Sequence, residues 1–362
     1  MALSKASLIY LAVFTLRTTP ASSLALKKWP YQFGRSQLRT ILTKECAYKV
    51  QSYWSQPWDP NDPTYDKCTV AVDCVLQHTN ETVKQNLASA VVILGLTPSL
   101  LSSLGPSISE SSMLSFKQPW LSVLVSFGAP AVYPTRIWTY DDPFNAIVRL
   151  ADQKVRTNNN KALQNLVKMT SKGNIRRFVL SVEYLLAMAA IVNIVQISID
   201  LGQRTVLSWF CGNWYMPVCW VLVPGLIHAL GTLSFWLVPK RELPFLPIAR
   251  SLRSDNHGPR KVIVSKGPSS LSMIIYSAAV GFAVGHLMLG TLIFSSLLFM
   301  MVSDAIPVIF RFAASAVVAR FINQYELTLM REEYGVEWDE SFDDAHNVTP
   351  EISEYHSSAA RI

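Results

Sequence analysis

Apolar residues along the chain gather into continuous blocks instead of recurring at the spacing of a soluble helix or strand. A helix needs about 20 apolar residues to cross a hydrocarbon core of roughly 30 Å. Blocks at 178–200, 215–238 and 271–319 reach that length, and a shorter block that contains a proline covers 87–104. The pattern therefore predicts an all-α bundle of membrane-spanning helices.

The block at 271–319 is too long for one crossing, because a single helix of that length measures about 70 Å at about 1.5 Å per residue. Asp304 followed by Pro307 is a helix-start signal, with Asp304 as the N-cap. We therefore predict two spanning helices, 271–302 and 305–322, joined by a turn beside Asp304.

The first 23 residues have the features of a secretory signal peptide. Lys5 precedes an apolar stretch at 6–16, and small residues at 21–23 offer a cleavage site. A short signal anchor is the alternative, because basic residues follow closely and favour the cytosol. Cleavage places the next segment, 24–86, in the lumen or outside the cell.

The segment 24–86 is polar, rich in aromatic residues and contains three of the five cysteines. Domains of about 60 residues bury little surface and often need disulfides. A fourth cysteine lies between two predicted helices on the same side, so two bridges in any of three pairings are compatible with the sequence, as are unpaired buried thiols. The four candidates are Cys46, Cys68, Cys74 and Cys211.

Basic residues cluster in two loops. The segment 136–177 holds nine basic residues against three aspartates, and 239–270 holds seven against two acidic residues. Such loops face the cytosol by the positive-inside rule and are candidates for contact with anionic lipid headgroups. The net charge of +7 therefore reflects topology and not nucleic-acid binding. A sequon at Asn80 is compatible with a glycosylated lumenal segment.

The block at 119–135 is interrupted by Gly128, Pro130 and Pro134. A lumenal N-terminus and a cytosolic first basic loop require an odd number of crossings between them. We therefore favour a re-entrant or interfacial segment at 119–135, with 87–104 crossing alone. A cytosolic N-terminus with both blocks spanning is the alternative, and it leaves the cysteines reduced.

The C-terminal segment 323–362 is acidic, with ten acidic residues against two arginines from Glu326 onward. It begins as a plausible amphipathic helix and loses periodicity around 339–344, so we expect a disordered cytosolic tail. The tail either solubilises the protein or docks a cytosolic protein partner.

Polar side chains inside the predicted spans are costly in lipid and are candidate sites, although many such residues only join helices. Asn193, Gln196 and Asp200 lie on one helix face at i, i+3 and i+7. Asp304 and Arg311 are seven residues apart and are a candidate ion pair. The candidates are Glu183, Asn193, Gln196, Asp200, His228, His286, Asp304 and Arg311.

Signatures of catalysis or cofactor binding are missing: the sequence has no GxSxG, P-loop, GxGxxG, HExxH or EF-hand pattern. CxxC spacing is also absent, which argues against zinc. We therefore predict a protein that is not an enzyme and needs no cofactor. An intramembrane enzyme requires Glu183 and the two histidines to lie within about 10 Å of one another.

A set of short motifs lies in and around the first apolar blocks: Cys74-Val75-Leu76, the run from Leu94-Gly95-Leu96-Thr97-Pro98 to Leu101, Leu104-Gly105-Pro106-Ser107, Glu110, Gln118-Pro119 and the run from Gly128-Ala129-Pro130 to Pro134. With these motifs, part of the chain resembles a family of uncharacterised multi-pass membrane proteins of filamentous fungi. The resemblance covers residues 65–145 and, more loosely, 286–326. It implies the class of protein and no activity.

These features together predict a polytopic transmembrane helical bundle with a small cysteine-containing ectodomain, in contact with the lipid bilayer of the secretory pathway or plasma membrane. Half of the residues are apolar and 16% are charged, which is the balance expected of such a chain. The predicted role is non-enzymatic sensing or scaffolding. The alternative is a transporter or channel for a small solute or ion that uses the polar residues of the spans.

Overall fold

The structure is a computed structural model. The signal peptide predicted at 1–23, most of the first basic loop and the tail beyond residue 334 lie outside the residues that it describes. The described ranges are 35–55, 64–135, 169–170, 173–211, 213–237, 240–243, 262–265 and 269–334.

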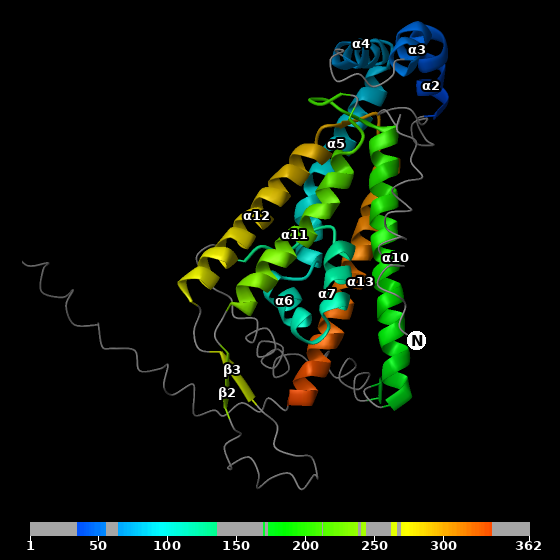
Figure 1. The fold of residues 1–362 in the computed structure, drawn as a ribbon. Coiled ribbons are helices and arrows are strands. Elements are labelled where there is room, and N and C mark those ends of the chain that lie inside the picture. Colours follow the sequence, from blue (N-terminus) through cyan, green and yellow to red (C-terminus); the bar gives the residue numbers. More distant parts are fainter. Residues whose placement is uncertain are drawn as a thin grey trace, which may run out of the picture.

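Five long apolar helices pack against one another and form the body of the molecule (Figure 1). Each is long and apolar enough to cross a membrane, and each satisfies its own backbone hydrogen bonds, as lipid requires. The prediction of an all-α multi-pass bundle is confirmed. The helices are α5 (Glu81–Leu104), α10 (Gly173–Arg204), α11 (Met216–Trp236), α12 (Ser270–Phe294) and α13 (Val302–Tyr334).

The turn between the last two helices precedes the predicted position. Helix α12 ends at Phe294 and α13 begins at Val302, so Asp304 lies inside the first turn of α13 and is not its N-cap. Pro307 lies in the second turn of α13, where it lacks the N–H that an intrahelical hydrogen bond to Ser303 would need. The turn is set instead by β4 (Leu297–Leu298), which pairs with β1 (Val206–Leu207) in the preceding turn.

Helices α10 and α13 are longer than predicted. Helix α10 begins at Gly173, inside the predicted basic loop, and α13 continues to Tyr334, inside the predicted acidic tail. Glu326 is completely buried in the bundle, so assigning it to a solvated tail was wrong. An acidic side chain tolerates burial only with a partner, and Arg176 of α10 supplies one.

A small helical cap covers one end of the bundle (Figure 1). Its elements are α2 (Arg35–Thr40), the π-helical turn η2 (Ile41–Glu45), α3 (Ala47–Ser55) and α4 (Thr64–Gln77).

The core of the cap continues into the bundle, because Val206 and Phe299 from the two adjoining turns pack among its buried residues. Tyr53 belongs to the same core, and burial raises the pKa of its phenol, so this side chain stays neutral. The cap and the two turns therefore form one packed unit.

The opposite end of the bundle holds the ends of the helices that continue into the basic segments. An antiparallel hairpin of β2 (Lys240–Leu243) and β3 (Val262–Ser265) connects α11 to α12 there. Figure 1 shows this hairpin and the end of α13 far from the cap. The cap and the β2–β3 hairpin thus lie at opposite ends of the bundle.

The segment predicted to be re-entrant or spanning forms part of a short helical insertion, α6 (Ile108–Lys117) and α7 (Pro119–Gly128). A capping box between Ser107 and Glu110 starts α6. The backbone returns to pair Tyr133 with Ser107, so the insertion begins and ends at one place. A ten-residue helix such as α7 rises about 15 Å, half of the hydrocarbon thickness.

Candidate functional site

The polar face of α10 is used to hold α13. Asn193 donates from Nδ2 to the backbone oxygen of Arg311 over 2.9 Å and to Oγ of Ser315 over 2.8 Å. Arg311 donates from Nε to Oδ1 of Asn193 over 2.8 Å and from Nη2 to Oε1 of Gln196 over 3.3 Å. The side chain that the sequence suggested as a partner of Asp304 therefore contacts α10.

The exposure of this polar face changes along its length. Asn193 and Arg311 are half-buried, whereas Gln196 is exposed on the surface of the described bundle. Asp200 lies further toward the cap, half-buried, and Asp304 is buried; both have partners. The middle of the span thus carries an arginine whose hydrogen-bond partners are neutral amide oxygens.

His286 is locked against Trp220 in the centre of the bundle. The two rings stack at 4.9 Å between centroids with an interplanar angle of 13°. Trp220 Nε1 donates to the backbone oxygen of His286 over 3.1 Å, and His286 Nε2 donates to the backbone oxygen of Trp220 over 3.0 Å. Reciprocal bonds of this kind join α11 to α12, so His286 is a structural residue.

A glycine makes this contact fit. A Cβ atom at Gly290 would lie 2.4 Å from Nε1 of Trp220 and 2.9 Å from Cγ of Pro98. The indole therefore fills the space that a side chain on α12 would take, and α5, α11 and α12 meet around it.

His228 joins α11 to the helical insertion. Its Nε2 lies 3.2 Å from Oγ of Ser122, and Ser122 donates its hydroxyl proton to the backbone oxygen of Ser111 over 2.8 Å. Because a hydroxyl has one proton, His228 Nε2 is the donor in the first contact. A histidine that donates to serine is not a general base for it, so this pair is a cross-link and not a nucleophile with its base.

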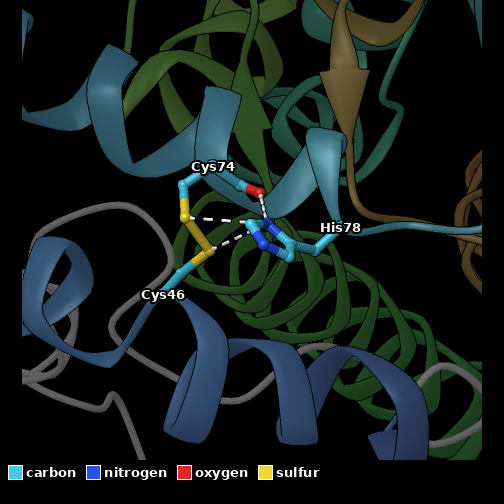
Figure 2. Close-up of side chains that lie close together, drawn as sticks. All are labelled: Cys46, Cys74 and His78. Atoms are coloured by element: carbon cyan, nitrogen blue, oxygen red, sulfur yellow. Dashed lines mark hydrogen bonds between the residues drawn. A yellow bond between two sulfur atoms is a disulfide. The ribbon is translucent and has the colours of Figure 1, made fainter.

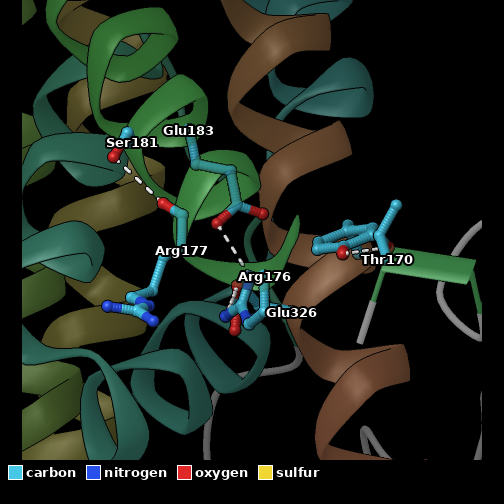
Figure 3. A network of polar contacts seen from close by, with 7 residues as sticks. Thr170, Arg176, Arg177, Ser181, Glu183 and Glu326 are labelled. Carbon is cyan, nitrogen blue, oxygen red and sulfur yellow. Dashed lines mark hydrogen bonds and ion pairs between the residues drawn. The ribbon is translucent and has the colours of Figure 1, made fainter. Parts of the chain in front are cut away.

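Glu183 belongs to a charged cluster that the sequence did not indicate (Figure 3). Arg176, two turns earlier on the same face of α10, is paired with Glu326 of α13, and its Nη1 lies 3.5 Å from Oε2 of Glu183. Arg176 had been assigned to the basic loop and Glu326 to the tail. A signal was present in the i, i+7 spacing of Arg176 and Glu183, but the partner 150 residues away has no local signature.

The three residues that an intramembrane enzyme requires to lie close together are held in separate contacts. Glu183, His228 and His286 have the separate partners described above, and in the described part of the chain they do not bring three ligand atoms within 4.8 Å of one another. The group that does so is Cys46, Cys74 and His78 (Figure 2).

That group is a disulfide beside a histidine. Cys46 and Cys74 are bonded to each other, and His78 donates from Nδ1 to the backbone oxygen of Cys74 over 2.9 Å. A disulfide has no thiolate to offer, so the group does not bind a metal as it stands.

All four candidate cysteines form disulfides, and the structure decides between the three pairings. Cys46 pairs with Cys74 inside the cap, and Cys68 pairs with Cys211 in the turn between α10 and α11. The prediction of two bridges is confirmed. The second bridge ties the cap covalently to the bundle.

Fold and cross-links together define the class of this chain as a multi-pass integral membrane protein with a disulfide-closed cap. No protein-family model, curated protein or solved structure matches the chain. Membership of the fungal family therefore stays a prediction, and the geometry of the described residues carries the functional argument.

Proposed function

We propose that this protein is a non-enzymatic sensing or scaffolding protein of the surface or endomembrane system, with its cap in the lumen or outside the cell. The observation that carries the proposal is the Cys68–Cys211 bridge, because it joins the cap to the two turns that connect the membrane helices and makes them one packed unit. Disulfides persist in oxidising compartments, and the segments rich in basic residues, 136–177 and 239–270, favour the cytosol.

The use of polar residues within the spans supports the same proposal. His228, His286 and Asn193 join helices through hydrogen bonds between their side chains and neighbouring helices. Polar groups arranged in this way stabilise a fixed bundle. A transport path needs polar groups that are free to meet a solute.

The orientation is tested at Asn80. This residue is exposed and immediately precedes α5, so a cap in the lumen presents it to the glycosylation machinery. We expect glycosidase treatment to increase the electrophoretic mobility of the protein from cells and to leave that of Asn80→Gln unchanged. A protease added to sealed microsomes should spare a cap epitope and remove a C-terminal one; the reverse pattern contradicts the proposed orientation.

Scaffolding within the membrane is tested at Gln196. A half-buried arginine and an exposed amide in mid-span are costly in lipid, so we propose that a second membrane helix with a carboxylate covers Gln196 and Arg311. A photoreactive benzoylphenylalanine at position 196 should give a cross-linked product of discrete mass in native membranes. The same residue at position 226, where Leu226 is exposed on α11, is the control.

Removing the charge of Arg311 tests whether the cross-linked protein is a specific partner or a random neighbour in the membrane. Arg311→Gln should abolish the product, because the carboxylate of the partner then loses its counter-charge. A product that persists in Arg311→Gln, or that forms equally from position 226, contradicts the scaffolding proposal. A product of twice the chain mass identifies the partner as a second copy.

The transporter hypothesis predicts a different result for substitutions in the same helices. It requires that replacing Asp200 or His286 changes the flux of a solute while the abundance of the protein is unchanged. Because His286 is held by contacts with Trp220, we expect its replacement to lower the amount of folded protein instead.

A further inference from the structure

Two buried carboxylates share one positive charge between α10 and α13. Glu326 is completely buried, Glu183 is 5% exposed, and in the described part of the chain Arg176 is the only ion-pair partner of either. Figure 3 shows the guanidinium between the two side chains. Two carboxylates and one guanidinium leave the cluster with one net negative charge when both carboxylates are ionised.

One oxygen of each carboxylate has no hydrogen-bond partner among the residues that the structure describes. Arg176 uses Oε1 of Glu326 and Oε2 of Glu183, so Oε2 of Glu326 and Oε1 of Glu183 are left unbonded. Buried carboxylate oxygens are rarely left in this state, because desolvation without a partner costs several kilocalories per mole in general.

A third buried acceptor lies on the same helix face. Asn323 is completely buried, and within the described ranges neither its Oδ1 nor its Nδ2 has a hydrogen-bond partner. It precedes Glu326 by three residues, so the two side chains share one face of α13. The carboxylates are therefore accompanied by a neutral amide oxygen of the kind that coordinates small cations.

The other ionisable groups around the cluster do not supply the missing charge. Tyr184 and Tyr325 are phenols, and Tyr325 is bonded to Oγ1 of Thr170 over 2.6 Å. Helix α7, which packs against α10 and α13, has no ionisable side chain.

Two ionisable groups come from α6, which packs on α13. Glu110 bonds the backbone of Ser107, and Lys117 ends the helix with a partner of its own. The nearby arginines are also engaged, since Arg177 bonds Asn174 and Arg320 bonds the backbone oxygens of Ser103 and Gly105.

We propose that Glu183, Glu326 and Asn323 form a binding site for one monovalent cation, either a proton shared by the carboxylates or an alkali ion such as sodium. The bound charge neutralises the cluster and joins α10 to α13 at the end of the bundle opposite the cap. Glu183 lies five residues inside the apolar block that begins at Phe178, about 8 Å along the helix, so the site is close to that membrane boundary. This inference does not rest on the proposed function.

The test is the thermal unfolding of the full-length chain in phosphatidylcholine nanodiscs, followed by tryptophan fluorescence. Choline chloride keeps the ionic strength constant while sodium chloride is titrated in at fixed pH, and the pH is then varied without sodium. A sodium site predicts a midpoint that rises with sodium by about 2–4 °C or more. A proton site predicts a midpoint that rises as the pH falls, with no effect of sodium.

The variants Glu326→Gln and Glu183→Gln each remove the excess negative charge and keep the shape of the side chain. We expect either variant to lose the dependence that the wild-type chain shows. Glu81→Gln is the control, because Glu81 is exposed and paired with Lys84 beside the cap; it should retain the dependence. If one glutamine variant does not fold, the other carries the test.

Two results overturn the proposal. One is a wild-type midpoint that responds to neither sodium nor pH. The other is a dependence that survives in the glutamine variants.

Discussion

The double substitution Cys68→Ser with Cys211→Ser is expected to release the cap from the bundle and to give a cap that proteases cleave at least about tenfold faster than in the wild-type chain. The bridge closes a separation of 143 residues. Loss of a native disulfide typically costs about 2–5 kcal/mol, and the loss is larger for longer loops. The spanning helices keep their backbone hydrogen bonds in lipid. We therefore expect the lost free energy to weaken mainly the contact between the cap and the bundle.

The measurement is limited proteolysis of the purified protein in nanodiscs under non-reducing conditions, with cleavage sites mapped within residues 35–77. Cys219→Ser is the matched control, because Cys219 is a free, exposed thiol on α11. Its cleavage rate should equal that of the wild-type chain. Equal rates for the double variant and the control would show that the cap is held by its apolar contacts alone.

Trp220→Ala is expected to have the second large effect and to lower the free energy of unfolding by about 3–5 kcal/mol. Trp220 is completely buried, stacks on His286 and is met edge-on by Phe294 and Phe312. The variant removes the indole, its hydrogen bond to α12 and the contact with Gly290. The thermal midpoint in nanodiscs should fall by about 10 °C, and abundance in cells should fall with it.

The control for this substitution is on the same helix. Trp236→Ala removes an indole that is 60% exposed at the end of α11, so we expect a small change in midpoint. Equal thermal midpoints for the two alanine variants would contradict the prediction that the contacts of Trp220 in the centre of the bundle stabilise the fold.

The polar residues of the spans could be found from the sequence, but their roles were not readable there. Asn193 and Gln196 stand out because amides are costly in lipid. Their common partner, Arg311, lies 118 and 115 residues away, on a helix whose rotation about its axis is set by packing. A single sequence does not record that rotation.

Arg176 and Glu326 show the same limit more strongly. Local composition assigned the arginine to a basic loop, because Lys172 and Arg177 stand beside it, and the glutamate to an acidic tail, because it is the first of ten acidic residues there. Helices α10 and α13 extend beyond their apolar blocks and bring the two side chains together. Local composition does not predict that a charged residue will be buried by a segment far away in the chain.

The hydropathy of the sequence also did not predict the arrangement of the short helices α6 and α7. Their apolar block is too short and too interrupted to decide between a re-entrant segment and a crossing. The packing of Ser122 against His228, and of Gly128 against Ala190, places the insertion inside the bundle.

By itself, the sequence determined the class of protein, the number of long helices and the four cysteines that pair, because backbone groups in lipid demand long apolar helices and small domains demand covalent support. Only the tertiary structure decided which cysteines pair, where the helices end and which buried charges meet. These depend on contacts between segments far apart in the chain, and their free energy arises only when the helices are packed.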